Sequence, residues 1–338
     1  MAEQQTAAVH VARGASYIFI QGIATNIMMV LAFVVIARIL TVAEMGAMTV
    51  LLMITGAARI IACLGMPTSV TRFVAESLAR NDREAAAGSF YQALRTNLTV
   101  SLLIAAATLI LAPHLAASLL ADPSKTTLFQ ILAFDIIPTA GLIPALNSAM
   151  LGLQKIKRLS LINIAYVATR QTLIVALTIL TRSLQGLVTA WLISELLAAS
   201  ALHMCLRSDL GPTSLKFSLK YLTKFSFPLL LQEIVNYAYG WFDRAILLAY
   251  ASLDTLGIYN ASMTAFGVLA SVPGAISTAL FPLYSAIKGR HGVETLENSI
   301  KAASRYICLI AMPLSFGLAA TAKPALTLFV GEAYGEGT

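Results

Sequence analysis

The sequence predicts an all-α polytopic membrane protein with about nine transmembrane helices. Of its 338 residues, 58% are hydrophobic and only 12% are charged, whereas an ordinary soluble chain is about 25% charged. The apolar residues come in runs of about twenty or more, the length that crosses a bilayer as a helix. Short basic clusters separate these runs, as in the loops of multi-pass membrane proteins. The composition therefore excludes a soluble enzyme, a disordered chain and a secreted disulfide scaffold.

The first six apolar runs each hold at most one charged residue, and we expect them to form a six-helix lobe over residues 1–206. The segment between the second and third runs, 67–96, contains RFVAESLARNDREAAAG and predicts a short amphipathic helix followed by a turn. The six spans are expected at 16–37, 45–66, 97–121, 126–151, 159–181 and 184–206.

The next segment, 207–225, carries four basic residues and is the best internal boundary, a cytoplasmic loop between lobes. Three further spans follow it, at 226–251, 257–286 and 302–322, within a second lobe over 226–338. Nine spans would leave the two termini on opposite sides of the membrane. We therefore expect the second lobe to be incomplete and the chain to be truncated relative to a whole transporter.

Loop charges predict the orientation. With the N-terminus inside, segments on the inner side hold sixteen Lys and Arg residues, and those on the outer side hold four. This asymmetry predicts a multi-pass protein of the cell (cytoplasmic or inner) membrane with a cytoplasmic N-terminus. The net charge of +7 is spread over these loops and forms no single basic patch, so we expect no nucleic-acid partner.

Catalytic and metal-binding motifs are absent from the sequence. It contains no phosphate-binding GxxxxGK[ST] loop, HExxH, GxSxG or GxGxxG, and its four histidines and three cysteines have no ligand spacing. We expect no enzyme activity, no bound cofactor and no metal site.

A shift of 211 residues aligns the second lobe with the first. Gln21 then falls on Gln232, Gly46 on Gly257 and Gly56 on Gly267. Both lobes read as a long apolar helix, a short turn, a glycine and another apolar helix. The pattern predicts a parallel repeat about an axis along the membrane normal, although chance similarity between apolar helices is the alternative.

Four segments together resemble a known family. They are ARILTVAEMGAMTV in the first outer turn, LGMPTSVTRFVAES after the second span, FSFPLLLQEIVNYAYGWFDRAILLAYASLDTLGIYNAS over the seventh and eighth spans, and FVGEAYGEG near the end. In order and spacing they resemble the polysaccharide and oligosaccharide flippases of the MATE-like (multidrug/oligosaccharidyl-lipid/polysaccharide) exporter superfamily. The family usually has twelve to fourteen spans.

This resemblance implies a transporter that flips a polyprenyl-(pyro)phosphate-linked oligosaccharide across the cytoplasmic membrane for cell-surface polysaccharide biosynthesis. It implies alternating access around a cavity lined mainly by the first, second, seventh and eighth spans. The expected partners are the lipid-linked oligosaccharide and membrane lipid, with polysaccharide assembly proteins as further candidates. Na⁺ or H⁺ is the expected coupling ion.

Polar residues at membrane depth are the candidate site, because charge inside a bilayer costs about 2.5–3.5 kcal/mol per residue. Arg59 and Arg244 offer guanidinium donors to a phosphate or an acidic sugar, and amides and phenols suit sugars. Helix–helix hydrogen bonding is the alternative role for each of these residues. The candidate cavity residues are Arg59, Arg244, Gln21, Asn26, Gln232, Asn236, Tyr239 and Asn260.

A second set of residues is expected to bind the coupling ion or to form structural ion pairs: Asp243, Glu233, Asp135, Arg170 and Glu195. Arg170 and Glu195 lie at the centres of consecutive antiparallel spans, so we expect them to pair, with Asp135 as a competitor for Arg170. Asp243 and Arg244 are adjacent, point about 100° apart and are not expected to pair.

Three alternatives to the flippase stay open. A cation-coupled multidrug exporter of the same superfamily would favour an acid-dominated cavity. A non-transporting membrane component would fit an incomplete second lobe. A membrane glycosyltransferase would need paired carboxylates on a large loop, which the sequence lacks.

Overall fold

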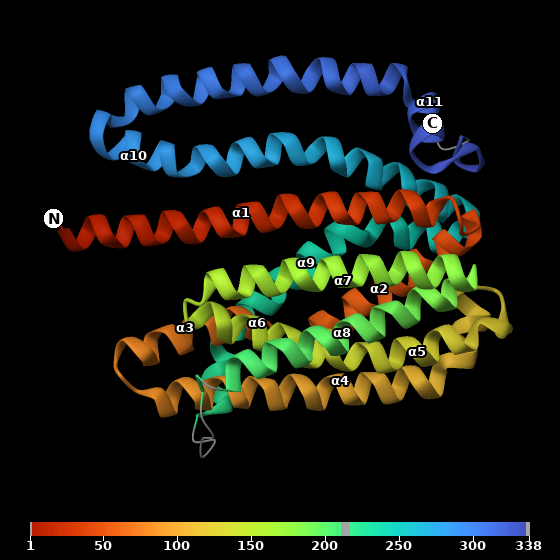
Figure 1. Cartoon of the computed structure of the whole chain (residues 1–338), viewed down its shortest axis with the longest axis horizontal. Coiled ribbons are helices and arrows are strands. Elements are labelled where there is room, and N and C mark those ends of the chain that lie inside the picture. Colours follow the sequence, from red (N-terminus) through yellow and green to blue (C-terminus); the bar gives the residue numbers. More distant parts are fainter. Residues whose placement is uncertain (1, 208, 211–216, 336–338) are drawn as a thin grey trace.

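The computed structural model describes residues 2–207, 209–210 and 217–335, with side chains except those of 2–15, 268–279, 281–283 and 285–292. Figure 1 shows long helices that run side by side. Each helix satisfies its own backbone hydrogen bonds, as a bilayer requires. The elements are α1 (Ala2–Ala37), α2 (Val42–Cys63), α3 (Met66–Ala79), α4 (Arg83–Leu119), η1 (Pro123–Lys125), α5 (Thr126–Ile136), η2 (Ile137–Leu142), α6 (Ile143–Gly152), α7 (Ile156–Thr181), α8 (Leu184–Arg207), α9 (Leu219–Tyr250), α10 (Leu253–Ala320), α11 (Ala322–Val330) and η3 (Glu332–Tyr334).

Seven of the described helical stretches are long and apolar enough to cross a membrane, and they match the expected spans one to six and nine. The seventh expected span lies in α9, whose polar residues keep it out of this set although it is 32 residues long. The eighth, 257–286, lies largely outside the residues whose side chains are described. The fold class is confirmed: the chain is a multi-pass helical membrane protein.

Two expected boundaries were wrong by about two turns or more: α4 begins at Arg83 instead of 97, and α9 at Leu219 instead of 226. The first expected span, 16–37, agrees with the membrane-crossing stretch Ser16–Ala37, although α1 itself begins at Ala2. Hydropathy marks only the part of a helix that lies in lipid, whereas the backbone ladder continues beyond it. A local signal marks the start of α4: Asp82 caps the helix, and its carboxylate accepts a hydrogen bond from the Ala85 amide at 2.9 Å.

The fourth expected span, 126–151, is not one regular helix. A π-helical segment, η2, separates α5 from α6. Pro138 and Pro144 stand at the starts of η2 and α6 and remove backbone donors there. The expected amphipathic helix and turn after the second span are confirmed as α3 and the residues up to Asp82.

α10 provides two passes. Its 68 residues would extend about 100 Å as a straight helix, far more than a bilayer's thickness. Figure 1 shows that it folds back on itself, so that its two arms run antiparallel. These arms correspond to the eighth and ninth expected spans.

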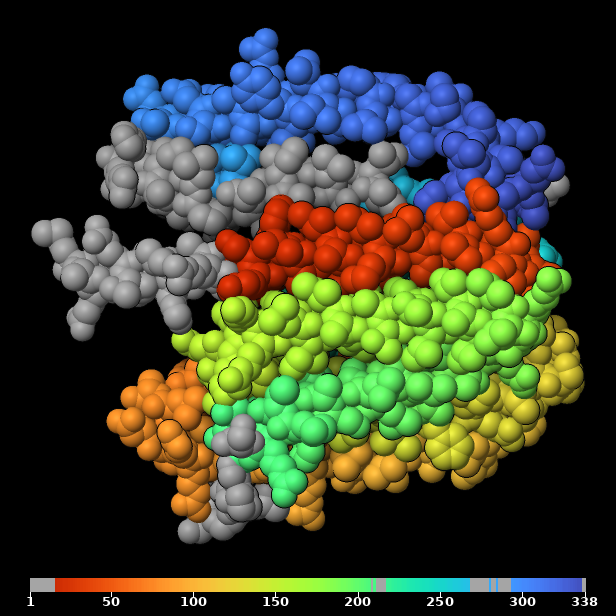
Figure 2. All heavy atoms as spheres, in the orientation of Figure 1, coloured from red at the N-terminus to blue at the C-terminus, as the bar shows by residue number. Residues whose placement is uncertain are grey.

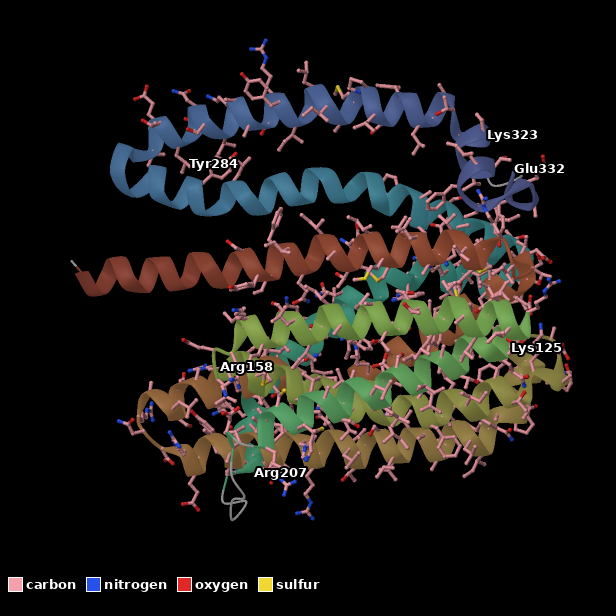
Figure 3. The ribbon with its side chains drawn as sticks, viewed as in Figure 1. Lys125, Arg158, Arg207, Tyr284, Lys323 and Glu332 are labelled. Atoms are coloured by element: carbon pink, nitrogen blue, oxygen red, sulfur yellow. The ribbon has the colours of Figure 1, made fainter. Side chains whose placement is uncertain are left out.

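The bundle has two ends, which we call the Thr41 end and the Gly65 end. Figure 3 places Arg158 and Arg207 toward one end, the Gly65 end. It places Lys125, Lys323 and Glu332 toward the opposite, Thr41 end. The loop-charge argument places Arg158 and Arg207 on the inner side and Lys125 and Lys323 on the outer side. The helices therefore alternate in direction as the sequence predicts.

The two helix starts at the Thr41 end are built alike. Thr41 caps α2, and its hydroxyl accepts from the Glu44 amide at 3.2 Å. Ser252 caps α10, and its hydroxyl accepts from the Thr255 amide at 3.2 Å. Both members of the second pair lie 211 residues after those of the first. The shift read from three identities thus also relates the helix caps.

A reciprocal contact joins these helix starts, and we call it the glycine junction: Gly46, Gly257, Val42 and Leu253. A Cβ on Gly46 would overlap the Leu253 carbonyl oxygen, and a Cβ on Gly257 would overlap the Val42 carbonyl oxygen. Val42 and Leu253 are also 211 residues apart. The contact is therefore self-complementary, like an interface about a two-fold axis. The lobe boundaries at 206 and 226 stay a prediction.

Candidate functional site

A cavity of about 460 Å³ opens between α2, α3, α6 and α9, toward the Gly65 end of α2. Its lining includes three of the predicted site residues, Arg59, Gln232 and Glu233. They come from two helices that are far apart in sequence. All the other lining residues are neutral: Ile60, Cys63, Gly65, Pro67, Thr68, Pro144, Asn147, Ser148 and Leu229.

Arg59 is exposed to this cavity. Among the described residues, no hydrogen bond or ion pair engages its guanidinium, and Glu233 on the same cavity does not come within ion-pair distance. A guanidinium that lacks a protein partner retains all its donors for an anionic ligand. The cavity thus carries one cation with donors to spare, one acid and a set of neutral polar groups.

Sequence reasoning missed the contribution of α6 to the cavity. Asn147 lines it, and the Oδ1 atom of Asn147 is buried without a hydrogen-bond partner among the described residues. Thr68 and Ser148 line it as well. The one available signal was the polar pair Asn147-Ser148 within an apolar run, which by itself does not show that α6 meets α2 and α9.

The polar residues of α9 differ in whether they reach the cavity, and those that do lie near the Gly65 end. Tyr237 lies against α2, where its hydroxyl donates to the Met53 carbonyl at 2.5 Å. A Cβ on Gly56 would meet the Tyr237 ring at 2.9 Å. This contact turns Asn236 and Tyr239 away from α2, and both are exposed, Tyr239 at 91%. Neither lines the cavity.

The polar residues of α1 also lie apart from the cavity. α1 packs mainly against α7. Gln21 is half-buried and Asn26 is exposed. The Thr25 hydroxyl bonds the Gln21 carbonyl at 2.9 Å, a contact within the helix. In this arrangement the two candidates Gln21 and Asn26 do not join Arg59.

Arg244 belongs to a separate cluster where α9 meets α10. Its Nε donates to Asn260 Oδ1 at 3.3 Å, and Nη1 lies 3.4 Å from Asp243 Oδ1. Asp243 accepts from the Tyr259 hydroxyl at 2.6 Å. The expectation that Asp243 and Arg244 do not pair was wrong. The long Arg244 side chain turns back toward the Gly240 carbonyl, 2.9 Å away, which brings it alongside its neighbour.

A third cluster lies between α7 and α8. Arg170 Nη1 lies 3.2 Å from Glu195 Oε1, so the expected ion pair is confirmed. Tyr166 joins the two, donating to Glu195 and accepting from Arg170 at 2.8 Å. Asp135 is buried nearby on α5 and accepts from Thr139 at 3.3 Å. Glu195 is 3% exposed, and such a buried charge must be compensated.

Glu195→Gln should destabilise the protein, because it removes the ion-pair partner of the half-buried Arg170. We expect the free energy of unfolding to fall by about 3–5 kcal/mol, measured by thermal unfolding in detergent. The matched control is Glu297→Gln, which removes an exposed carboxylate 3.9 Å from Lys301 and should cost less than about 1 kcal/mol. Equal losses in the two variants would contradict a structural role for the buried pair.

The fold matches that of solved transporters. An inward-facing multidrug resistance MATE family transporter of the MOP superfamily superposes with a TM-score of 0.66 and 14% identity, over 92% of this chain and 74% of that chain. A MATE protein in complex with MaD3S superposes with a TM-score of 0.63 and 16% identity, over 97% of this chain and 76% of that chain. The outward-facing conformation of a multidrug resistance MATE family transporter superposes with a TM-score of 0.59 and 15% identity, over 97% of this chain and 77% of that chain. At these identities the likeness shows the fold.

Comparison with curated proteins gives no match. Comparison with family profiles gives one, described as "Polysaccharide biosynthesis protein", which matches residues 35–337. The match runs from the end of α1 to the end of the chain and includes the cavity and the glycine junction. This chain therefore belongs to the polysaccharide biosynthesis protein family, and it is a multi-pass membrane protein with the fold of MATE transporters of the MOP superfamily.

Proposed function

We propose that this protein flips a polyprenyl-(pyro)phosphate-linked oligosaccharide across the cytoplasmic membrane by alternating access. The observation that carries the proposal is the Arg59 guanidinium, which pairs with no described residue, in a cavity whose other lining residues are neutral apart from Glu233. A phosphate or pyrophosphate needs charged, fork-shaped donors. The attached sugar needs amides and hydroxyls, which Asn147, Gln232 and Thr68 supply.

The cavity and the glycine junction lie at opposite ends of α2, which suits alternating access. With the Gly65 end inside the cell, the head group enters the cavity from the inner leaflet while the tight contact at Gly46 and Gly257 seals the outer side. Separation of α2 from α10 at that junction then exposes the head group outside. The polyprenyl chain stays in lipid throughout. No covalent bond changes, and the protein acts as a transporter, not an enzyme.

Coupling to Na⁺ or H⁺ would use the acids at membrane depth. Glu233 lines the cavity beside the substrate, and Asp135 is buried with one carboxylate oxygen, Oδ1, unpartnered among the described residues. Glu195 is already held by Arg170 and Tyr166. Asp135 and Glu233 are therefore the better candidates for an exchangeable proton or cation.

A cation-coupled multidrug exporter is the second candidate. The observation that favours it is Glu233, an acid exposed to the same cavity, since a carboxylate attracts organic cations. Arg59 on the same cavity opposes it. If Arg59 dominates the cavity, the ligand is an anion, as the flippase requires. If Glu233 dominates, the ligand is an organic cation, as the exporter requires.

A thermal-shift assay on purified protein in detergent separates the candidates, with a polyprenyl-pyrophosphate oligosaccharide, an organic cation drug and Na⁺ as separate ligands. A ligand at about 100 times its Kd stabilises the fold by about 2.7 kcal/mol. We expect a shift with the lipid-linked sugar. A shift with the cation alone would establish the exporter instead, and no shift with any ligand would indicate a non-transporting component.

A further inference from the structure

A second hollow lies at the Thr41 end, away from the cavity. It is an open groove of about 900 Å³ between α5, α7 and α8. Lys125, labelled in Figure 3, stands at this end just before α5. Figure 2 shows α7 and α8 side by side on the visible face, and α7 ends at the same side of the molecule where α8 begins. The groove shares no lining residue with the cavity.

The lining of the groove is uncharged and combines polar side chains with the apolar Ile131, Phe134 and Leu177. It includes two amides and four hydroxyls, from Thr127, Gln130, Thr181, Ser183, Gln185 and Thr189. None of the described lining residues is charged. A phosphate, a carboxylate or a metal ion would find no compensating charge there. The chemistry instead matches a ligand that has many hydroxyl groups and no net charge.

The groove is a built feature of the helix packing. Gly186 lets α8 approach α7 closely, because a Cβ there would overlap Thr181 Oγ1 and the Leu177 carbonyl oxygen. Gln185 donates to Thr127 and so ties α8 to α5. Ser183 donates to Thr181 at 3.1 Å. Polar side chains on three elements are thereby held around one space.

Hydrogen-bonding capacity remains in this groove. The Thr181 and Thr189 hydroxyls donate to carbonyls of their own helices, both at 2.8 Å. Thr181 also accepts from Ser183 and keeps one acceptor lone pair, whereas Thr189 keeps two. Gln130 is exposed, and among the described residues no hydrogen bond uses its amide. Donors and acceptors thus stand together, as a sugar hydroxyl requires, since each hydroxyl both gives and takes a hydrogen bond.

An aromatic ring completes the groove. Phe134 lies two turns below the start of α5 and is 54% exposed. A flat apolar ring beside amides and hydroxyls suits a pyranose, which presents an apolar C–H face and a polar rim. The volume lies within the range of about 300–1,000 Å³ that small-molecule sites occupy.

We propose that this groove binds a neutral saccharide unit at the Thr41 end of the bundle, with Phe134 against the ring face and Gln130 hydrogen-bonded to its hydroxyls. A phospholipid head group is the competing occupant at this depth. The absence of charge from the described lining disfavours it, because such head groups carry a phosphate. The site is independent of Arg59, so it stands or falls separately from the proposed flippase.

The test is saturation-transfer difference NMR of the full chain in detergent with a panel of neutral disaccharides: maltose, cellobiose and lactose. We expect at least one to bind with a Kd near the millimolar range. Gln130→Met and Phe134→Leu should each weaken binding about tenfold or more, while Arg59→Gln leaves the Kd unchanged. Both groove variants change exposed side chains, so they should fold, as a matching thermal unfolding midpoint verifies.

Two outcomes would overturn the proposal: no disaccharide binds, or the Kd is the same in both groove variants. A photo-crosslinking residue in place of Gln130, in nanodiscs of phosphatidylethanolamine and phosphatidylglycerol with the bound disaccharide present, identifies the occupant. Crosslinks to the disaccharide support the saccharide site. Crosslinks to phospholipid alone would make the groove a head-group site instead.

Discussion

Arg59→Gln is expected to weaken binding of a polyprenyl-pyrophosphate oligosaccharide by about 10- to 100-fold, because hydrogen bonds to charged groups contribute about 1.5–3 kcal/mol. The variant keeps a polar, hydrogen-bonding side chain but removes the charge and the fork and shortens the reach. Since no described residue pairs with Arg59, the substitution strands no protein charge, and the fold should be retained. The measurement is the Kd in detergent by titration, with the unfolding midpoint recorded beside it.

Two further variants make this result specific. Arg59→Lys keeps the charge without the planar fork and should fall between the wild type and Arg59→Gln. Arg80→Gln removes an exposed arginine from the turn after α3, outside the cavity lining, and should leave the Kd unchanged. An unchanged Kd in Arg59→Gln would remove this residue from the site.

The same cavity distinguishes the flippase from the drug exporter through opposite responses. Removal of the Arg59 charge should weaken an anionic ligand and strengthen an organic cation, because like charges on one cavity repel. Glu233→Gln should have the reverse effect on both ligands. A cation that binds more weakly in Glu233→Gln, together with a lipid-linked sugar indifferent to Arg59→Gln, would favour the exporter.

Gly46→Ala is expected to open the Thr41 end of the bundle. The added Cβ would overlap the Leu253 carbonyl oxygen, and a backbone atom in a helix cannot move aside as a flexible side chain can. Overpacking of this kind costs about 1–3 kcal/mol, equivalent to a shift of about 5- to 150-fold in the equilibrium between the closed and open junction. Gly257→Ala should act alike, through Val42.

Distance measurements by electron spin resonance between labels at residues 43 and 254 report this opening. We expect a longer distance in either glycine variant. The double variant should open the junction little further than each single one, because both act on one contact. Gly317→Ala is the control, since a Cβ there would meet nothing within 4 Å. Unchanged label distances in both variants would show that the junction does not depend on this close contact.

Much of the fold was predictable because it depends on local properties of the chain. Apolar length places a helix in lipid, and basic loops alternate between the two ends of the bundle, as Arg158 and Lys125 do in Figure 3. The Arg170–Glu195 pair was predictable because consecutive antiparallel helices bring their midpoints together. The 211-residue shift was visible in three identities, and the helix caps at Thr41 and Ser252 follow it.

The candidate site was less predictable because it depends on how distant helices pack. Gln232 and Asn236 lie one turn apart on the same face of α9, but only the turn that holds Gln232 and Glu233 reaches the cavity, and the contact of Tyr237 with Gly56 lies beyond it. Helical periodicity groups residues by face but does not say how far along the helix a cavity extends. The Asp243–Arg244 pair was missed because the expectation used only the angle between the two Cα–Cβ bonds. An arginine side chain is long enough to turn back to its neighbour. Asn147 lines the cavity because α6 packs near α2 and α9, which the sequence alone does not show.

The central claim is that the protein moves a lipid-linked oligosaccharide between leaflets, and the most direct test is transfer in proteoliposomes. The reconstituted full chain should flip a fluorescent polyprenyl-pyrophosphoryl oligosaccharide, followed by its accessibility to a membrane-impermeant quencher. We predict transfer above that of protein-free liposomes, lost in Arg59→Gln and retained in Arg80→Gln. Transfer equal to that of protein-free liposomes, with the protein folded and inserted, would contradict the proposed function.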